Sequence, residues 1–501
     1  MADTAQSFPH PLYEKYVLRP FFEDAEAYYY DPMLAANKTH VVMLYQQDII
    51  SAENARALLS ALQQVDEMGL EGLGYQSGVE DLFFTIESKL IELVGAEHGG
   101  NLQLARSLND LGYALTRLAL RPMLIDALQY LLDLRASLLQ FARDHLETLM
   151  PGYTHTQPAQ PTTMAHYIAG VLSFLERDYQ RVHFAHQTNN QSPLGAAALT
   201  GTGFPIDRQL SADLLGFDRV MPSTYDSIGT SDNLTDVANA LTSIGVSMSR
   251  WTHDMLFWAT RESNAIRIDD SFIQISSIMP QKRNPVVLEH LRARISRMLG
   301  QAHAVVIQCH NIPFGDTQDI EDEIFPMIFG SLQSAHEILH LYTAVIDTLH
   351  VNVDHLRERS IAGFTTVTEL ADTLVRIAGL PFRQAHSVVS GMVTHALQHD
   401  LEPHDLTPDM LSQVAQARIG RDVRLTAEQL HTAIDPQAFV EARNIQGGAA
   451  PSATSAVLDE IATQLQRDSD QLQGLRSNLI EADHRLQTEV DNIMQQEEMT
   501  E

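Results

Sequence analysis

Cysteine and long apolar runs are scarce in this chain. Cys309 is the single cysteine among 501 residues, which excludes an internal disulfide framework and fits a reducing compartment. No apolar run approaches the roughly 18 residues of a membrane span. The N-terminus also lacks the basic flank and apolar stretch of a secretory signal. We therefore expect a cytoplasmic protein with no membrane partner.

Positive charge is scarce as well. The 33 lysines and arginines are outnumbered by 64 aspartates and glutamates, which gives a formal net charge of −31 at pH 7. Nucleic acids and anionic membranes are bound through clustered cations, so the sequence predicts neither as a partner. Four basic residues are lysines: Lys15, Lys38, Lys89 and Lys282. A lysine at 282 therefore indicates a need for a compact ammonium, with chance placement on a solvated loop as the alternative.

Apolar residues recur at helical spacing through most of the chain, and strand-like alternation is scarce. Five long helices are predicted, at about 109–150, 162–190 and 232–261, directly after Pro285, and at about 329–357. Their apolar faces exceed what one small bundle buries. The predicted fold class is all-α, with a central long-helix bundle that packs against copies of itself; the alternative is a solitary elongated bundle.

Glycine and proline positions divide the chain into four predicted parts. We expect an N-terminal helical domain over 1–108 and the central long-helix bundle over 109–360. A small C-terminal helical domain is expected over 361–465. Residues 466–501 form a polar helical tail, either docked or frayed.

Three polar turns lie at the ends of predicted long helices, at 106–110, 154–157 and 276–284. Turns of this kind offer unpaired backbone N–H groups together with hydroxyl and amide donors, which suit the binding of carboxylates. Pro280 and Pro285 deny the third turn a helical hydrogen-bond ladder. This turn can close over a small anion and exclude water, and we take it as the predicted chemical centre.

Several classes of site lack their sequence signature. There is no His-Glu-x-x-His motif or cysteine pair, no Gly-x-Gly-x-x-Gly or Walker A motif, and no Gly-x-Ser-x-Gly elbow. The sequence therefore predicts no metal and no cofactor. A lone histidine near a helix end is more often structural than catalytic. The setting of His155, between Thr154 and Gln157, favours the catalytic interpretation.

Together the three turns resemble the argininosuccinate lyase branch of the aspartase/fumarase superfamily. Residues 276–284 are similar to the signature Gly-Ser-Ser-x-Met-Pro-x-Lys-x-Asn, with Ile275 in place of its glycine. Residues 105–110 resemble Gly-Arg-Ser-Arg-Asn-Asp, and residues 151–157 resemble Pro-Gly-Tyr-Thr-His-x-Gln. The three motifs occur in the order typical of that branch, and the likeness extends over nearly the whole chain.

The resemblance implies an all-α homotetramer with active sites shared between subunits. It also implies a reversible β-elimination that releases fumarate from a small dicarboxylate substrate. Ser276 would be the general base, Lys282 would stabilise the aci-carboxylate intermediate, and His155 paired with Glu289 would serve proton transfer. The other implied substrate contacts are Arg106, Ser107, Asn109, Thr154, Gln157, Ser277 and Asn284.

The departures from this branch gather on the side of the leaving amine. Leu108 stands in place of the motif's second arginine, and Val286 in place of a usual aspartate. Asp316 and Gln318 fall where the branch has a tyrosine and a lysine. Losing a buried, charge-paired contact weakens binding, so argininosuccinate should bind poorly.

We therefore expect a carbon–nitrogen lyase that acts on another N-substituted aspartate or related succinyl compound. Two alternatives stay open: a genuine argininosuccinate lyase, and a catalytically silent structural protein on the same scaffold. The second rests on Ile275, which stiffens the loop before Ser276. A carbon–oxygen lyase is a weaker third possibility.

Overall fold

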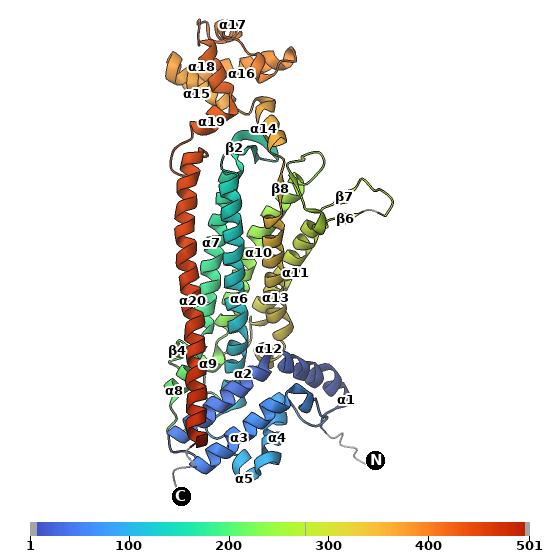
Figure 1. Ribbon diagram of the computed structural model, residues 1–501, viewed down its shortest axis with the longest axis vertical. Helices are drawn as coiled ribbons and strands as arrows, with labels where there is room; N and C mark the ends of the chain where they lie inside the picture. The colour runs from blue at the N-terminus through green and yellow to red at the C-terminus, as the bar shows by residue number, and fades with distance from the viewer. Residues whose placement is uncertain (1–7, 276, 496–501) are drawn as a thin grey trace.

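Five long helices run side by side through the middle of the protein (Figure 1). The computed structural model describes residues 8–275 and 277–495. The five helices are α6 (Leu108–Asp144), α7 (Met164–Asn189), α10 (Asp232–Trp258), α11 (Val286–Gln308) and α13 (Phe325–Asp347). Each packs on two neighbours, in the order α6, α7, α10, α11, α13 and back to α6. The predicted all-α class with a central long-helix bundle is confirmed.

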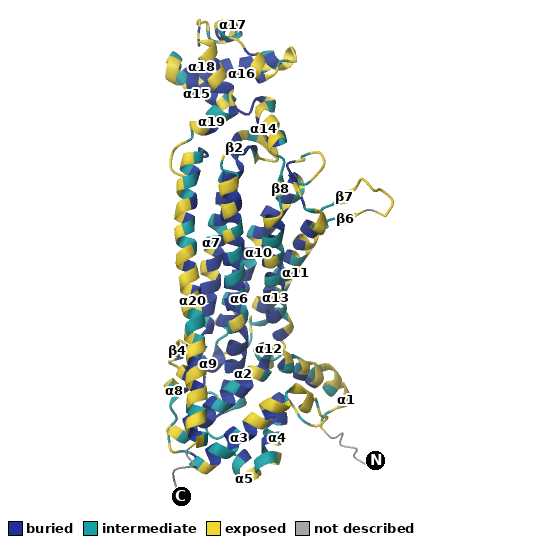
Figure 2. Ribbon diagram, in the orientation of Figure 1, coloured by how far each residue is buried: buried dark blue, intermediate teal, exposed yellow. Residues whose placement is uncertain are grey.

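The bundle forms because its helices carry apolar residues on several faces. Leu128, Leu172, Ile244, Leu291 and Leu339, one from each helix, are fully buried. In Figure 2 the inward surfaces of the bundle are buried, and exposed residues gather on its outside and on the connecting loops. Within the described residues, no helix combines the length and the apolar character that a membrane span needs.

The ends of the long helices depart from prediction in two places. The helix expected to reach about residue 357 ends at Asp347, and a separate helix, α14 (Val353–Ile361), follows a short strand. The helix expected to reach Met150 ends at Asp144, because residues 149–163 form a β-hairpin. Apolar spacing alone does not mark these ends, since β1 continues the run of buried residues and Val351 of β8 is half-buried.

The strands form short two-stranded pairs between the helices. The hairpin of β1 (Leu149–Thr154) and β2 (Gln157–Thr163) is antiparallel, as are β5 (Ile266–Arg267) with β8 (His350–Val351) and β6 (Gln274–Ile275) with β7 (Arg283–Asn284). Strands β3 (Gln191–Ser192) and β4 (Arg219–Val220) pair in parallel. Short helices α8 (Arg208–Leu214), α9 (Thr224–Gly229) and α12 (Gln318–Glu321) and the 3₁₀ turn η3 (Asp270–Phe272) complete the connections.

The N-terminal segment packs across the end of the bundle where α6 begins (Figure 1). Its main helices are α2 (Arg19–Gln46), α3 (Ala52–Met68) and α4 (Leu82–Val94). Shorter elements are α1 (Pro11–Tyr13), a π-helical turn η1 (Glu14–Leu18), the 3₁₀ turn η2 (Leu70–Gly72) and α5 (Ala96–Gly99). Its apolar residues join the same core as the bundle.

A second, smaller core lies at the opposite end (Figure 1). It is formed by buried residues between Phe364 and Ile434. The elements here are η4 (Ala362–Phe364), α15 (Val367–Ala378), α16 (Phe382–Gln398), η5 (Pro403–Asp405), α17 (Pro408–Ile419), α18 (Ala427–Ile434) and α19 (Pro436–Glu441).

The last helix corrects the expected division of the C-terminal region. Helix α20 (Pro451–Gln495) is continuous through the predicted boundary between 465 and 466 and lies along α6 and α7. Asp468 and Arg135 of α6 are both buried and form an ion pair of 2.6 Å, and Tyr179 donates to the backbone oxygen of Asp468 at 2.8 Å. The narrow apolar stripe of residues 466–495 made this segment look like a tail in the sequence. In the structure, that stripe and the buried ion pair hold α20 against α6 and α7.

Candidate active site

The first predicted turn lies where α6 begins, next to α2 and the loop after β3. The Ser107 hydroxyl accepts from the backbone N–H of Asn109 at 3.3 Å, and Asp110 accepts from the N–H of Ser107 at 3.0 Å. The second carboxylate oxygen of Asp110 accepts from the N–H groups of Gly195 and Ala197 at 2.8 and 3.0 Å. This capping box fixes the start of the helix and the neighbouring loop together.

Arg106 has a structural setting that its sequence motif did not reveal. Its side chain is buried and donates to Asn37 of α2 at 2.7 Å and to Gln103 at 3.0 Å. Burial lowers the pKa of Arg106 to about 10. Ser107, Leu108 and Asn109 are half-buried instead, and the Asn109 amide donates to the backbone oxygen of Ala198 at 3.3 Å. Arg106 therefore holds the turn against α2 from its buried side, whereas Ser107, Leu108 and Asn109 lie nearer the surface.

The second predicted turn is the tip of the β1–β2 hairpin. His155 and Thr156 have φ values of 51° and 64°, in the left-handed region that non-glycine residues seldom adopt. Thr154, His155 and Gln157 are exposed. A backbone held in this region at an exposed tip presents its side chains outward, which is typical of a contact surface.

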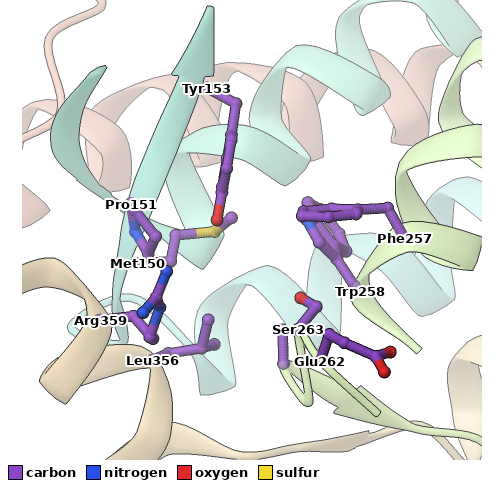
Figure 3. A pocket seen from close by; sticks show the side chains of 10 residues that line it. Met150, Pro151, Tyr153, Phe257, Trp258, Glu262, Ser263, Leu356 and Arg359 are labelled. Carbon is purple, nitrogen blue, oxygen red and sulfur yellow. The ribbon is translucent and has the colours of Figure 1, made fainter. Parts of the chain in front are cut away.

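A pocket of about 220 Å³ lies below this hairpin (Figure 3). Met150, Pro151 and Tyr153 line one side, and the other side includes Phe257 and Trp258 at the end of α10. The rings of Tyr153 and Phe257 meet edge to face with centroids 5.4 Å apart. None of the predicted site residues lines this pocket, so it supports the hairpin rather than forming the predicted site.

The third predicted turn projects from the bundle between β6 and β7 (Figure 1). Ser276 lies outside the described residues. Ser277 and Lys282 are exposed and Asn284 is half-buried, and the backbone N–H of Lys282 donates to the oxygen of Met279 at 3.0 Å. Ile275 pairs with Arg283 in the β6–β7 ladder, an extended setting that suits a β-branched residue.

Two further predicted residues lie on the first turn of α11, which follows this loop. Glu289 is exposed and Val286 is half-buried. Together with Gln274 and His290 they line a shallow hollow beside the base of the β6–β7 loop. Glu289 is the residue predicted to pair with His155.

One chain does not bring these turns together. The first turn lies at the start of α6, and the β1–β2 hairpin follows the end of the same helix. A helix rises about 1.5 Å per residue, so Asn109 and the hairpin are about 50 Å apart. Asp316 and Gln318 lie with the first group, because α12 packs against α6.

Sequence reasoning missed an acidic cluster beside the first turn, formed by Asp81, Asp316, Glu321 and Asp322. Burial and then the neighbouring acids raise the pKa of Glu321 to about 8 and that of Asp322 to about 7. Burial also raises the pKa of Asp81 to about 6. In the sequence, the acids between residues 319 and 323 were the one sign of this cluster. Asp81 comes from a distant segment and could not be linked to them.

Comparisons with known proteins place this geometry in a family. A family model described as "Lyase" matches residues 24–300, and one described as "Argininosuccinate lyase C-terminal" matches residues 364–441. The argininosuccinate lyase of Methanosarcina barkeri is 35% identical over 456 residues, covering 90% of this chain and 91% of that protein. Argininosuccinate lyase 2 of Agrobacterium fabrum is 36% identical over 453 residues, covering 90% and 89%.

Among solved structures, EDDS lyase in complex with formate superposes with a TM-score of 0.89. It is 28% identical in sequence, and the match covers 98% of this chain and 97% of that one. The 3-carboxy-cis,cis-muconate lactonizing enzyme of Pseudomonas putida has a TM-score of 0.68 at 17% identity, which shows a shared fold.

Proposed function

We propose that this chain splits an N-substituted aspartate, or a related succinyl compound, into fumarate and an amine. The chain belongs to the lyase family that includes the argininosuccinate lyases, and it is a carbon–nitrogen lyase. The observation that carries the proposal is the projecting β6–β7 loop. In a chain of net charge −31, this loop presents an exposed lysine, Lys282, together with the Ser277 hydroxyl and the Asn284 amide. Such a group of donors suits a substrate carboxylate.

The proposed chemistry begins with removal of a proton from the carbon next to a carboxylate. Ser276 is the proposed base, and the electrons move into that carboxylate to give an aci-carboxylate with two negative charges. The Lys282 ammonium and the Asn284 amide stabilise this charge as it develops, which is where fixed donors accelerate a reaction most.

Cleavage of the carbon–nitrogen bond then completes the elimination. The electrons return from the aci-carboxylate to form the double bond of fumarate, and the amine leaves with a proton. His155, oriented by Glu289, is the proposed proton donor. Ser107, Asn109, Thr154, Gln157 and Ser277 are the proposed contacts to the two carboxylates.

A shared site follows from the distance between these groups. Because Asn109 and His155 lie at opposite ends of α6, we propose that a homotetramer assembles each site from several chains. Exposed apolar side chains on the bundle helices support self-association: Phe184, Val246, Phe257, Val306 and Ile307. The molar mass in solution, measured by light scattering, tests this directly. A monomer at the concentration used for turnover would exclude the shared site.

The proposed substrate differs from argininosuccinate. Leu108 and Gln318 are uncharged, and Val286 is apolar, so these positions offer no charged group to an arginine leaving group. Ordinary turnover of argininosuccinate would contradict this part of the proposal and favour a genuine argininosuccinate lyase.

The test is a screen in both directions, with mass spectrometry to detect adducts of fumarate with a panel of amines and absorbance to follow fumarate release. Replacement Ser276→Ala should reduce turnover at least about a hundredfold, since a base contributes that much. Ser271→Ala, an exposed serine just before the loop, serves as the matched control. Absence of any adduct and of any fumarate would favour a catalytically silent structural protein.

A further inference from the structure

The pocket below the β1–β2 hairpin is enclosed by three segments that are far apart in the sequence (Figure 3). These are β1, the end of α10 with the turn after it, and α14. They contribute, in this order, Met150, Pro151 and Tyr153, residues between 257 and 265, and Leu356 with Arg359. Helix α14 packs against β1 and leads from the bundle to the small C-terminal core. The pocket therefore lies at the joint between these two parts of the chain.

The pocket has room for one ring that carries a small substituent. Its volume is about 220 Å³, whereas an apolar protein cavity of about 150 Å³ already holds benzene. The difference, about 70 Å³, is the share of roughly two water molecules in the liquid, which is about the size of a carboxylate.

One wall of the pocket is aromatic and held firmly in place. Trp258 is buried, and its ring meets Tyr167 edge to face with centroids 4.7 Å apart. The Tyr167 hydroxyl in turn donates to Asp254 at 2.6 Å. Phe257 lies beside Trp258, on the side of the pocket opposite Met150 (Figure 3). A fixed wall of this kind offers a flat apolar surface to the ring of a ligand.

Two hydrogen-bond donors lie across the pocket from this wall. In Figure 3 the Tyr153 hydroxyl and the Arg359 guanidinium are both on the side of Met150. In the part of the chain that the structure describes, no carboxylate forms an ion pair with Arg359. Glu262 also lines the pocket, but its carboxylate points away from Arg359 (Figure 3). A guanidinium with a hydroxyl beside it is a donor set that suits a carboxylate.

We propose that this pocket binds a small aromatic carboxylate. The carboxylate of the ligand accepts from Arg359 and Tyr153, and its ring packs against Trp258 and Leu356. A ligand in this position bridges β1 and α14, so it fixes the base of the hairpin whose tip carries His155. The inference concerns binding alone and does not depend on the proposed lyase function.

The test is a calorimetric titration of the full-length protein with benzoate. Benzyl alcohol keeps the ring without the charge, and acetate keeps the charge without the ring. Benzoate should bind at least about tenfold more tightly than either, because a charged hydrogen bond and a buried ring are each worth about that factor. Equal affinity for benzoate and benzyl alcohol would overturn the proposal.

A pair of arginine variants assigns the charge contact. Arg359→Met keeps an apolar stem without the guanidinium, and it should weaken benzoate binding at least about tenfold. Arg357→Met, an exposed arginine on the same helix that does not line the pocket, should bind benzoate as the wild type does. An unchanged affinity in Arg359→Met, or an equal loss in both variants, would contradict the assigned contact.

Hydrogen exchange measured by mass spectrometry locates the bound ligand. Saturating benzoate should slow amide exchange in β1 and α14, and it should leave α3, at the opposite end of the bundle, unchanged. Slower exchange confined to other segments would overturn the site. Because these measurements report binding, they would stand even if no amine were found to add to fumarate.

Discussion

The two ends of α6 carry proposed site groups in very different settings. At its start, Asp110 is buried and joined to three backbone N–H groups, so this chain alone fixes the turn. Beyond its far end, the tip of the β1–β2 hairpin and the β6–β7 loop present exposed side chains (Figure 2). In the proposed shared site, the first setting is completed within the chain and the second by a neighbouring molecule. Each prediction below alters one of these settings.

The largest effect on stability is expected from the buried ion pair that docks α20. Replacement Asp468→Ala leaves the Arg135 guanidinium buried without its partner, which should lower the free energy of unfolding by about 3–5 kcal/mol. Asp470→Ala, two residues away and exposed, should change it by less than about 0.5 kcal/mol. Chemical denaturation measures both, and equal small effects would show that α20 is held by its apolar stripe alone.

The exposed loop should respond in the opposite way, through activity and not through stability. Lys282→Ala should lower kcat about 10²- to 10³-fold because a charge-stabilising donor is lost, while the melting temperature stays unchanged. Lys89→Ala removes only a surface ion pair with Glu92 and should leave kcat intact. Steady-state kinetics and thermal melts check both, and a fully active Lys282→Ala variant would remove the lysine from the mechanism.

The buried start of α6 should show a smaller, mixed effect. Both carboxylate oxygens of Asp110 accept from backbone N–H groups. Asp110→Asn replaces one of these oxygens with an NH₂ group, which cannot accept a hydrogen bond, so the free energy of unfolding should fall by about 1–3 kcal/mol. Because the same residue positions Ser107 and the loop at Gly195, KM should rise more than kcat falls. Unchanged unfolding and unchanged KM would show that the cap is not needed.

The smallest effect is expected from pH acting on the acidic cluster beside the start of α6. The raised pKa of Glu321, with Asp81, Asp316 and Asp322 around it, means that its neutral form is favoured by folding. Its contribution is complete below the unfolded pKa of about 4.5 and is lost as pH rises through about 8. Glu321→Gln should therefore melt about 2 °C or more above wild type at pH 9 and match it near pH 4.5. A constant difference at all pH values would contradict this origin.

The sequence predicted the bundle better than it predicted the site. Five long helices could be placed because apolar residues recur at helical spacing along the chain. The continuity of α20 was missed, since one pair, Arg135 with Asp468, docks it across 333 positions of sequence. Arg106 was assigned to substrate, but its motif cannot distinguish a supporting residue from a contacting one. The acidic cluster was missed because its members meet only in the folded chain.

The central claim is that each active site takes groups from opposite ends of α6 on different chains. Co-refolding two inactive variants, Asn109→Ala and His155→Ala, tests it most directly. Hybrids should regain measurable fumarate release, because some sites then receive an intact Asn109 from one chain and an intact His155 from another, whereas either variant refolded alone stays inactive. Hybrids that form, as native mass spectrometry would show, but release no fumarate would contradict the account.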